Sequence, residues 1–181
     1  GGHVIVAGAR NPDVAAVIAQ CPFTDGPAST LAMHPLAALK VTAAAIGDLI
    51  GARRGKAPKL VDLAGPPGSR ALMTAPDAYP GYTALWPADD PPADQVAARV
   101  GLAIPFDRPG RAARKLHCPA FFAVCLDDSV APAKTTLRHV AKAPRAEVRG
   151  YPYGHFDIYL GEPFERVIAD QLDFLRRTVP V

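Results

Sequence analysis

Short apolar runs that end at turn-forming residues predict buried strands at two places in the chain. Residues 14–20 (VAAVIAQ) end at Cys21-Pro22, and residues 119–125 (PAFFAVC) end at a polar loop. Neither run has a polar face, which is typical of strands that helices cover on both sides of a parallel sheet. Residues 146–151 (AEVRGY) predict a third strand. We expect the three strands to be adjacent and parallel.

Helical periodicity and end signals predict five helices. The first has no polar face and stops at Asn11-Pro12, because the residue before a proline disfavours helical geometry. The last is the clearest, with Glu162 in its first turn and two arginines in its last turn, charges that complement the helix dipole. The predicted helices cover residues 2–10, 35–50, 93–104, 131–142 and 162–177.

Two of these helices carry one apolar stripe each, and such a stripe predicts the face that packs against a sheet. In the helix of residues 35–50, the stripe is Leu36, Leu39, Ala43, Ile46 and Ile50. In the helix of residues 162–177, it is Phe164, Val167, Ile168, Leu172 and Leu175.

The alternation of strands and helices predicts an α/β fold, with a mainly parallel sheet and helices on both faces. Residues 57–92 interrupt this order with a Pro/Gly-rich passage of little periodicity. A long irregular insertion in a regular domain usually serves as a lid or a binding segment. We therefore expect a core of residues 1–25 and 105–181 and a lid of residues 26–104.

The composition limits the classes of function. With 181 residues, of which 49% are hydrophobic, the chain is long enough to bury one sizeable core. The net charge is +3, but the basic groups at residues 53–56 and 111–115 are short and are not interleaved with stacking aromatics. This pattern argues against a nucleic-acid partner.

Apolar length and cysteine spacing add two further expectations. The longest apolar stretches, such as residues 119–126, stop far short of the roughly 18 residues that a membrane span needs, so we expect no membrane partner. The three cysteines, Cys21, Cys118 and Cys125, have no metal-type spacing. An odd number of scattered cysteines favours a reduced, cytoplasmic protein in which these are small buried residues.

A carboxylate and an imidazole follow two successive predicted strands. Asp127 and Asp128 come directly after residues 119–125, and His155 follows residues 146–151. Because functional groups of open parallel sheets collect at the carboxyl ends of the strands, these side chains are expected to meet. A buried carboxylate that fixes the tautomer of a histidine, whose other nitrogen accepts a proton from a nucleophile, is the arrangement of a catalytic triad.

Three stretches of the sequence resemble the serine α/β-hydrolases. CLDDSVAP is similar to the acid loop of that family, in which proline stands four residues after the aspartate, and this register selects Asp128 over Asp127. YPYGHFDIY is similar to the histidine loop around His155. GGHVIVAGARNPDVAAVIAQCPFTDG resembles the helix and strand that follow the G-x-S-x-G nucleophile elbow, where glycines allow a tight turn.

The resemblance implies the C-terminal part of an α/β-hydrolase fold with an inserted lid. It also implies a serine hydrolase that cleaves a small-molecule ester or amide through an acyl-enzyme, with no metal or organic cofactor. Asp128 and His155 would be catalytic, and the nucleophilic serine would stand just before Gly1, in a segment carrying G-x-S-x-G. The resemblance leaves the substrate open, and an oligomer is possible.

Other nucleophiles inside the chain have weaker signals. Ser29, Ser69 and Ser129 have no elbow sequence around them, and Pro22 denies Cys21 a sharp turn from strand to helix. The remaining histidines have no motif, and the aromatic residues of the insertion either line an acyl pocket or pack structurally. These residues are His3, His34, His117, His139, Tyr79, Tyr82 and Trp86. A second hypothesis therefore stays open, in which the chain is a non-catalytic or incomplete module that needs a partner segment.

Overall fold

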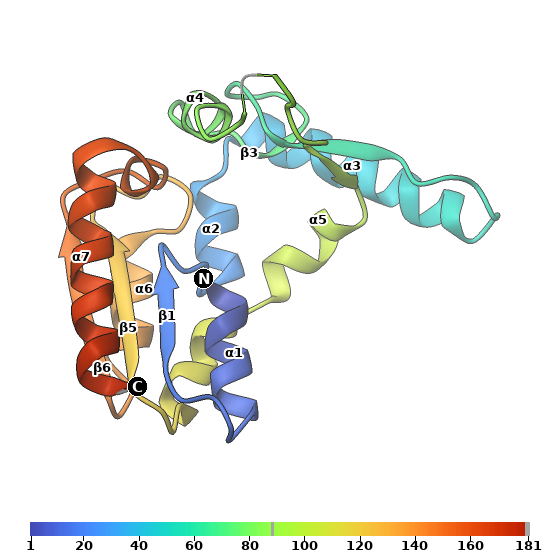
Figure 1. The fold of residues 1–181 in the computed structure, drawn as a ribbon. Coiled ribbons are helices and arrows are strands. Elements are labelled where there is room, and N and C mark those ends of the chain that lie inside the picture. The colour runs from blue at the N-terminus through green and yellow to red at the C-terminus, as the bar shows by residue number, and fades with distance from the viewer. Residues whose placement is uncertain (88, 180–181) are drawn as a thin grey trace. The chain divides into compact units, whose positions relative to one another are not determined.

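The computed structural model describes residues 1–87 and 89–179 and divides into two compact units (Figure 1). The first unit combines Gly1–Asp25 with Arg108–Val181, and the second unit is Gly26–Asp107. Of the predicted core and lid, residues 88, 180 and 181 lie outside the described residues. The role of residues 26–104 as a lid stays a prediction.

The first unit is built on a parallel sheet of three strands in the order β1-β5-β6. Both strand pairs are parallel, with Val17 opposite Ala120 in one pair and Ala120 opposite Ala146 in the other. All six residues of the central strand β5 are buried, because the strand has neighbours on both edges and helices on both faces. The strands are β1 (Val17–Gln20), β5 (Ala120–Cys125) and β6 (Ala146–Tyr151). The prediction of three adjacent parallel strands is confirmed.

Helices cover both faces of this sheet. Successive side chains of β5 point to opposite faces, so Phe122 joins a cluster with Ile5 and Val140, whereas Phe121 joins a cluster with Phe174. The first face carries α1 (Gly2–Arg10), α6 (Ala133–Val140) and the 3₁₀-helix η2 (Pro109–Lys115), and the second carries η3 (Asp157–Tyr159) and α7 (Gly161–Thr178).

The apolar stripe predicted for α7 is wrong by part of a turn. The buried residues are Val167, Gln171 and Phe174, whereas Phe164 and Leu172 are 37% and 45% exposed. The predicted stripe did not include the polar Gln171, whose side-chain oxygen accepts a hydrogen bond from Gln20 Nε2 at 3.3 Å. Phe174, and not Leu172, packs against Phe121 of the sheet.

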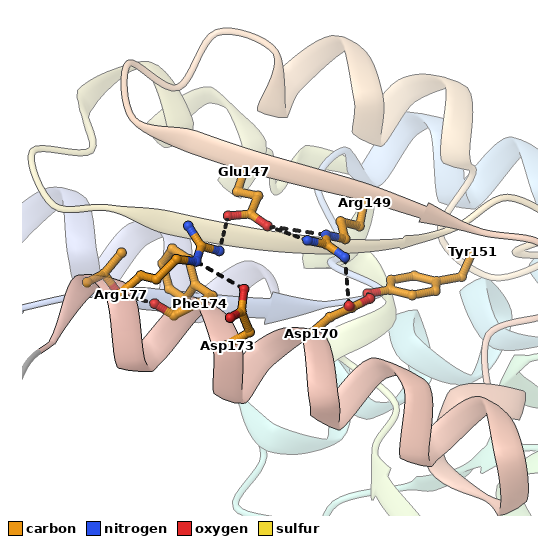
Figure 2. A network of polar contacts seen from close by, with 8 residues as sticks. Glu147, Arg149, Tyr151, Asp170, Asp173, Phe174 and Arg177 are labelled. Atoms are coloured by element: carbon orange, nitrogen blue, oxygen red, sulfur yellow. Dashed lines mark hydrogen bonds and ion pairs between the residues drawn. The ribbon is translucent and has the colours of Figure 1, made fainter.

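A polar network fastens α7 to β6 along one side of the sheet (Figure 2). The Tyr151 hydroxyl donates to Asp170 Oδ2 at 2.7 Å, and Arg149 Nη1 donates to Asp170 Oδ1 at 2.6 Å. Further along, Arg177 donates to Glu147 at 2.8 Å. Burial, together with the hydrogen bond to Asp170, raises the pKa of Tyr151 above its ordinary value.

The second unit has its own small sheet in the order β3-β2-β4. β2 pairs parallel with β3 and antiparallel with β4, where Leu60 lies opposite Ala97. The unit contains α2 (Gly26–Ala32), α3 (Pro35–Ala52), β2 (Leu60–Ala64), β3 (Ala71–Met73), α4 (Ala78–Thr83), β4 (Gln95–Ala97), α5 (Val100–Ala103) and η1 (Ile104–Phe106).

Two expectations for this unit are corrected. The passage of residues 57–92, expected to be irregular, contains two strands and a helix, and the helix expected at residues 93–104 begins as strand β4. Strands of three to five residues are too short to show a period in the sequence. The pairing of β4 with β2 overrides the local helical preference, as tertiary contacts often do.

The predicted stripe of α3 is also wrong, because the helix buries its opposite face. Ala37, Val41, Ala45 and Asp48 are buried, whereas the predicted leucines and isoleucines are 43–66% exposed. Asp48 is accepted in the interior because its carboxylate binds Arg99 Nε at 2.7 Å and the Lys59 N–H at 2.8 Å. The hydrogen bond from Arg99 lowers the pKa of Asp48.

Among the described helices, α3 is long and apolar enough to cross a membrane. Its 18 residues have a mean hydropathy of 1.4, and 22% of them are buried. Core helices of soluble proteins and signal sequences share these properties. Length and composition alone therefore do not assign this helix to a membrane.

Candidate active site

Asp128 and His155 lie together at the carboxyl edge of the first unit's sheet. Asp128 follows β5, His155 follows the neighbouring strand β6, and His155 Nδ1 is 2.8 Å from Asp128 Oδ2. The Asp128 side chain is 2% exposed and that of His155 is 18% exposed. Asp127 is exposed to solvent, and its backbone N–H donates to Tyr153 O. The structure therefore places Asp128, and not Asp127, against His155.

The second oxygen of Asp128 is held by its own loop. Asp128 Oδ1 accepts hydrogen bonds from the N–H groups of Val130 at 2.8 Å and Ala131 at 2.6 Å. The same side chain therefore forms a turn of the kind that aspartate favours and presents its other oxygen to the imidazole. Both lone-pair sets of the carboxylate are used, so its position is fixed before any ligand arrives.

The loop of His155 is fixed by neighbouring contacts. The Gly154 N–H donates to Asp157 Oδ2 at 2.8 Å, and the His155 ring meets the Phe156 ring edge-on with centroids 4.8 Å apart. Because a carboxylate accepts at Nδ1, the neutral imidazole carries its proton on that nitrogen. Nε2 is then the nitrogen with a free lone pair, which is the state that a general base requires.

Cys21 lies beside this pair, a position that sequence reasoning did not foresee. It directly follows β1, the neighbour of β5, and its backbone has a positive φ of 38°, which is rare for a residue with a side chain. Its Sγ lies 2.9 Å from Cys125 Sγ. The sequence feature that could have predicted this position is that Cys21 follows a predicted parallel strand, as Asp128 and His155 do.

The Cys21 thiol is poorly suited to act as a nucleophile. The hydrogen bond with Cys125, burial and the negative charge of Asp128 raise the pKa of the Cys21 thiol. The thiolate is the reactive form of cysteine, and here it is disfavoured. This agrees with the interpretation of Cys21 as a small buried residue.

Cys21, Asp128 and His155 also form a set of potential metal ligands. One donor atom of each lies within 4.8 Å of the others, and thiolate, carboxylate and imidazole are all zinc ligands. However, Asp128 and His155 already bind each other, and Cys21 favours its protonated form. Hydrogen bonding therefore accounts for the arrangement without a metal ion.

Gly1 and Gly2 pass tightly against the end of β1. A Cβ at Gly1 would lie 2.5 Å from Pro22 Cα and 2.7 Å from Gln20 O, and a Cβ at Gly2 would overlap Phe23 O. Only glycine permits this approach. The start of α1 is thus packed directly around Cys21, at the edge of the sheet that carries His155.

The weaker candidates belong to other segments of the chain or serve local structure. Ser29 and Ser69 belong to the second unit, and Ser129 follows Asp128 in its loop. His34 Nδ1 accepts the Leu36 N–H and caps α3. The insertion aromatics Tyr82 and Trp86 pack edge-on at 5.6 Å, and their role in an acyl pocket stays a prediction.

The sequence of the chain was compared with protein-family models and with curated proteins. No family model matches the chain. It is 51% identical over 181 residues to the quorum-quenching protein AidA of Acinetobacter baumannii (strain MDR-ZJ06), covering all of this chain and 60% of that protein. The chain therefore spans about three-fifths of the length of this relative.

Solved structures with a similar fold include α/β-hydrolases. The alpha/beta hydrolase GrgF from Penicillium sp. sh18 superposes with a TM-score of 0.73 at 21% identity, covering 100% of this chain and 62% of GrgF. The monoacylglycerol lipase of Paleococcus ferrophilus superposes with a TM-score of 0.64 at 18% identity, covering 97% of this chain and 64% of the lipase. The chain therefore has the α/β-hydrolase fold, which the resemblance of its three motifs predicted.

Proposed function

We propose that the protein is a serine hydrolase that cleaves an ester or amide bond through an acyl-enzyme. Asp128 orients His155, and His155 acts first as general base and then as general acid. The observation that supports this most is the 2.8 Å contact between His155 Nδ1 and Asp128 Oδ2, with the second oxygen of Asp128 held by two backbone N–H groups.

The proposed reaction proceeds in two halves. A serine hydroxyl attacks the substrate carbonyl while its proton moves to His155 Nε2, and the resulting imidazolium is stabilised by Asp128. His155 then gives this proton to the leaving alcohol or amine. In the second half, His155 takes a proton from water, the hydroxide attacks the acyl-serine ester, and the serine recovers its proton from His155.

The serine is proposed to stand directly ahead of Gly1, within a G-x-S-x-G segment that also supplies oxyanion donors. Two observations support this position. Gly1 packs on the backbone beside Cys21, whose Sγ lies within 4.8 Å of donor atoms of Asp128 and His155. Among the described strands, β1 pairs only with β5, so a strand leading into α1 would lie on the other edge of β1 by a right-handed crossover.

The name of the relative with 51% identity, a quorum-quenching protein, suggests a biological role in the breakdown of signalling molecules. Under this proposal the substrate is a small signalling molecule with an ester or amide bond. Residues 26–104 would act as the lid that selects it, with Tyr79, Tyr82 and Trp86 as candidate contacts for its acyl part. The second hypothesis is an incomplete or non-catalytic module, in which the dyad is present but is never supplied with a nucleophile.

Hydrolysis of p-nitrophenyl acyl esters distinguishes the two hypotheses. In the full natural chain, His155→Asn should reduce turnover by about 10⁴-fold or more, as loss of the triad base does in serine hydrolases. His117→Asn is the matched control, because His117 is exposed and lies outside the site. The 181 residues alone should show no triad-dependent turnover. Equal activities of both variants would support the non-catalytic hypothesis.

A further inference from the structure

A strongly basic cavity of about 530 Å³ lies in the first unit, outside the Asp128–His155 pair. It is bounded by the 3₁₀-helix η2, the end of α6 and the segment that follows β1. Its lining residues are Asp25, Arg108, Gly110, Arg111, Arg114, Arg138, His139 and Lys142.

Local helix geometry explains why the cations converge. Arg111 and Arg114 are three residues apart in η2, and a 3₁₀-helix repeats every three residues, so both side chains leave the same side. Arg108 precedes them at the N-cap with the same spacing. Arg138 lies in the last turn of α6, and Lys142 lies in the turn that follows the helix; both residues line the cavity.

Gly110, which lines the cavity, packs closely against Thr24 and His139. A Cβ at Gly110 would lie 2.7 Å from His139 Cγ and 2.7 Å from Thr24 Cβ, and the Gly110 N–H donates to Thr24 O at 2.9 Å. Beneath it, His139 Nε2 lies 3.3 Å from Asp25 Oδ2, with both side chains nearly buried. The segments that carry the cations are therefore packed against each other, and the five cationic side chains themselves are exposed to solvent.

The charges in the cavity are unbalanced. Five cationic side chains face one carboxylate, so with His139 neutral the lining carries more positive charge than the +3 of the whole chain. Among the described residues, none of the five cations is in an ion pair. Like charges held close together destabilise a fold, and a bound anion would relieve this repulsion.

We infer that this cavity binds a small molecule carrying two or more phosphate groups. Guanidinium groups bind phosphate oxygens in bidentate pairs, and several arginines on two facing elements suit several phosphates at once. The volume is in the range of small-molecule sites, about 300 to 1,000 Å³. The inference does not depend on the proposed hydrolase activity.

Binding of inorganic tripolyphosphate to the full natural chain, measured by titration calorimetry at fixed ionic strength, tests this inference. The double variant Arg111→Gln/Arg138→Gln should bind tripolyphosphate at least 30-fold more weakly. Arg10→Gln/Arg176→Gln removes the same charge elsewhere and should change the affinity by less than threefold, because neither residue lines the cavity. Orthophosphate should bind far more weakly than tripolyphosphate.

A thermal melt supplies a second readout that a folding defect would not imitate. Tripolyphosphate should raise the melting temperature of the natural protein by several degrees, because a ligand of the folded state stabilises it. Without ligand, Arg111→Gln/Arg138→Gln should melt at the same or a higher temperature, since it loses like-charge repulsion. Equal loss of binding in both double variants, equal binding of orthophosphate, or tighter binding of a single-stranded oligonucleotide would each overturn the inference.

Discussion

Replacement of Asp128 by asparagine separates the two tasks of this residue. Asparagine keeps one carbonyl oxygen, which can still accept the N–H groups of Val130 and Ala131 at about the distances that Asp128 Oδ1 has, 2.8 and 2.6 Å. Its amide nitrogen would face His155 Nδ1 and donate to it. Nδ1 must then be the acceptor and Nε2 must carry the proton, so His155 can no longer accept the serine proton.

The expected magnitudes differ for stability and activity. Hydrogen bonds to a charged group contribute about 1.5–3 kcal/mol each and neutral ones about 0.5–1.5, so losing the charge at two bonds should cost about 1–3 kcal/mol of folding free energy. Turnover should fall about 10⁴-fold, which corresponds to about 5 kcal/mol in the activation barrier. Asp127→Asn is the control, and a surface change of this kind should stay within about 0.5 kcal/mol.

Urea unfolding and ester hydrolysis by the full natural chain measure the two effects. Asp128→Asn should lose most of its turnover at a urea concentration where it is folded, while Asp127→Asn keeps both turnover and stability. ¹⁵N NMR of His155 should show the proton moving from Nδ1 to Nε2 in the Asp128 variant. Turnover of Asp128→Asn within tenfold of the natural protein, or a larger loss in Asp127→Asn, would contradict the role of Asp128 in orienting His155.

Three further predictions concern stability and thiol chemistry. Phe122→Ala should lower the free energy of unfolding by about 3–5 kcal/mol in urea, because Phe122 is fully buried in the centre of the sheet, and a cost below 1 kcal/mol would contradict this packing. Because the pKa of Tyr151 is raised in the folded state, its stabilising contribution is present below its ordinary value of 10.0 and is lost as the pH rises above it. Tyr151→Phe should therefore flatten the fall in stability above about pH 10 in urea titrations, and an unchanged slope would argue against the buried hydroxyl. The raised pKa of Cys21 predicts that iodoacetamide alkylates this thiol far more slowly than free cysteine at pH 8, and mass spectrometry that finds fast labelling would contradict the protonated state.

The sequence was sufficient to locate the sheet and the acid–histidine pair. The three strands are predictable because a parallel strand covered on both faces has a characteristic apolar run, as in β5, where all six residues are buried. Asp128 and His155 are predictable because each follows its strand directly, so two local patterns are enough to bring them together at one edge.

Other features depend on contacts that leave no local pattern. The buried faces of α3 and α7 were misassigned because Asp48 and Gln171 are polar, and only their partners Arg99 and Gln20 show why the interior accepts them. The strands of the second unit are too short for a period to appear. The spacing of apolar residues therefore predicts that these segments are helical, but it does not predict which face of each helix is buried.

The basic cavity is another feature of this kind. In the sequence, residues 111–115 are a short basic group that is not interleaved with stacking aromatics, a pattern that argues against a nucleic-acid partner and does not indicate a cavity. In the fold, Arg111 and Arg114 meet Arg138, 24 residues further on than Arg114, across a single cavity. The convergence results from the packing of η2 against α6 and has no counterpart in sequence spacing.

The proposal that His155 serves a serine ahead of Gly1 is tested most directly by mapping a fluorophosphonate adduct in the full natural chain by mass spectrometry. The reagent labels only an activated serine. The account predicts one adduct, on the residue directly preceding Gly1, its loss in His155→Asn, and no adduct on the isolated 181 residues. Stoichiometric labelling of Ser29, Ser69 or Ser129, or labelling that persists in His155→Asn, would contradict it.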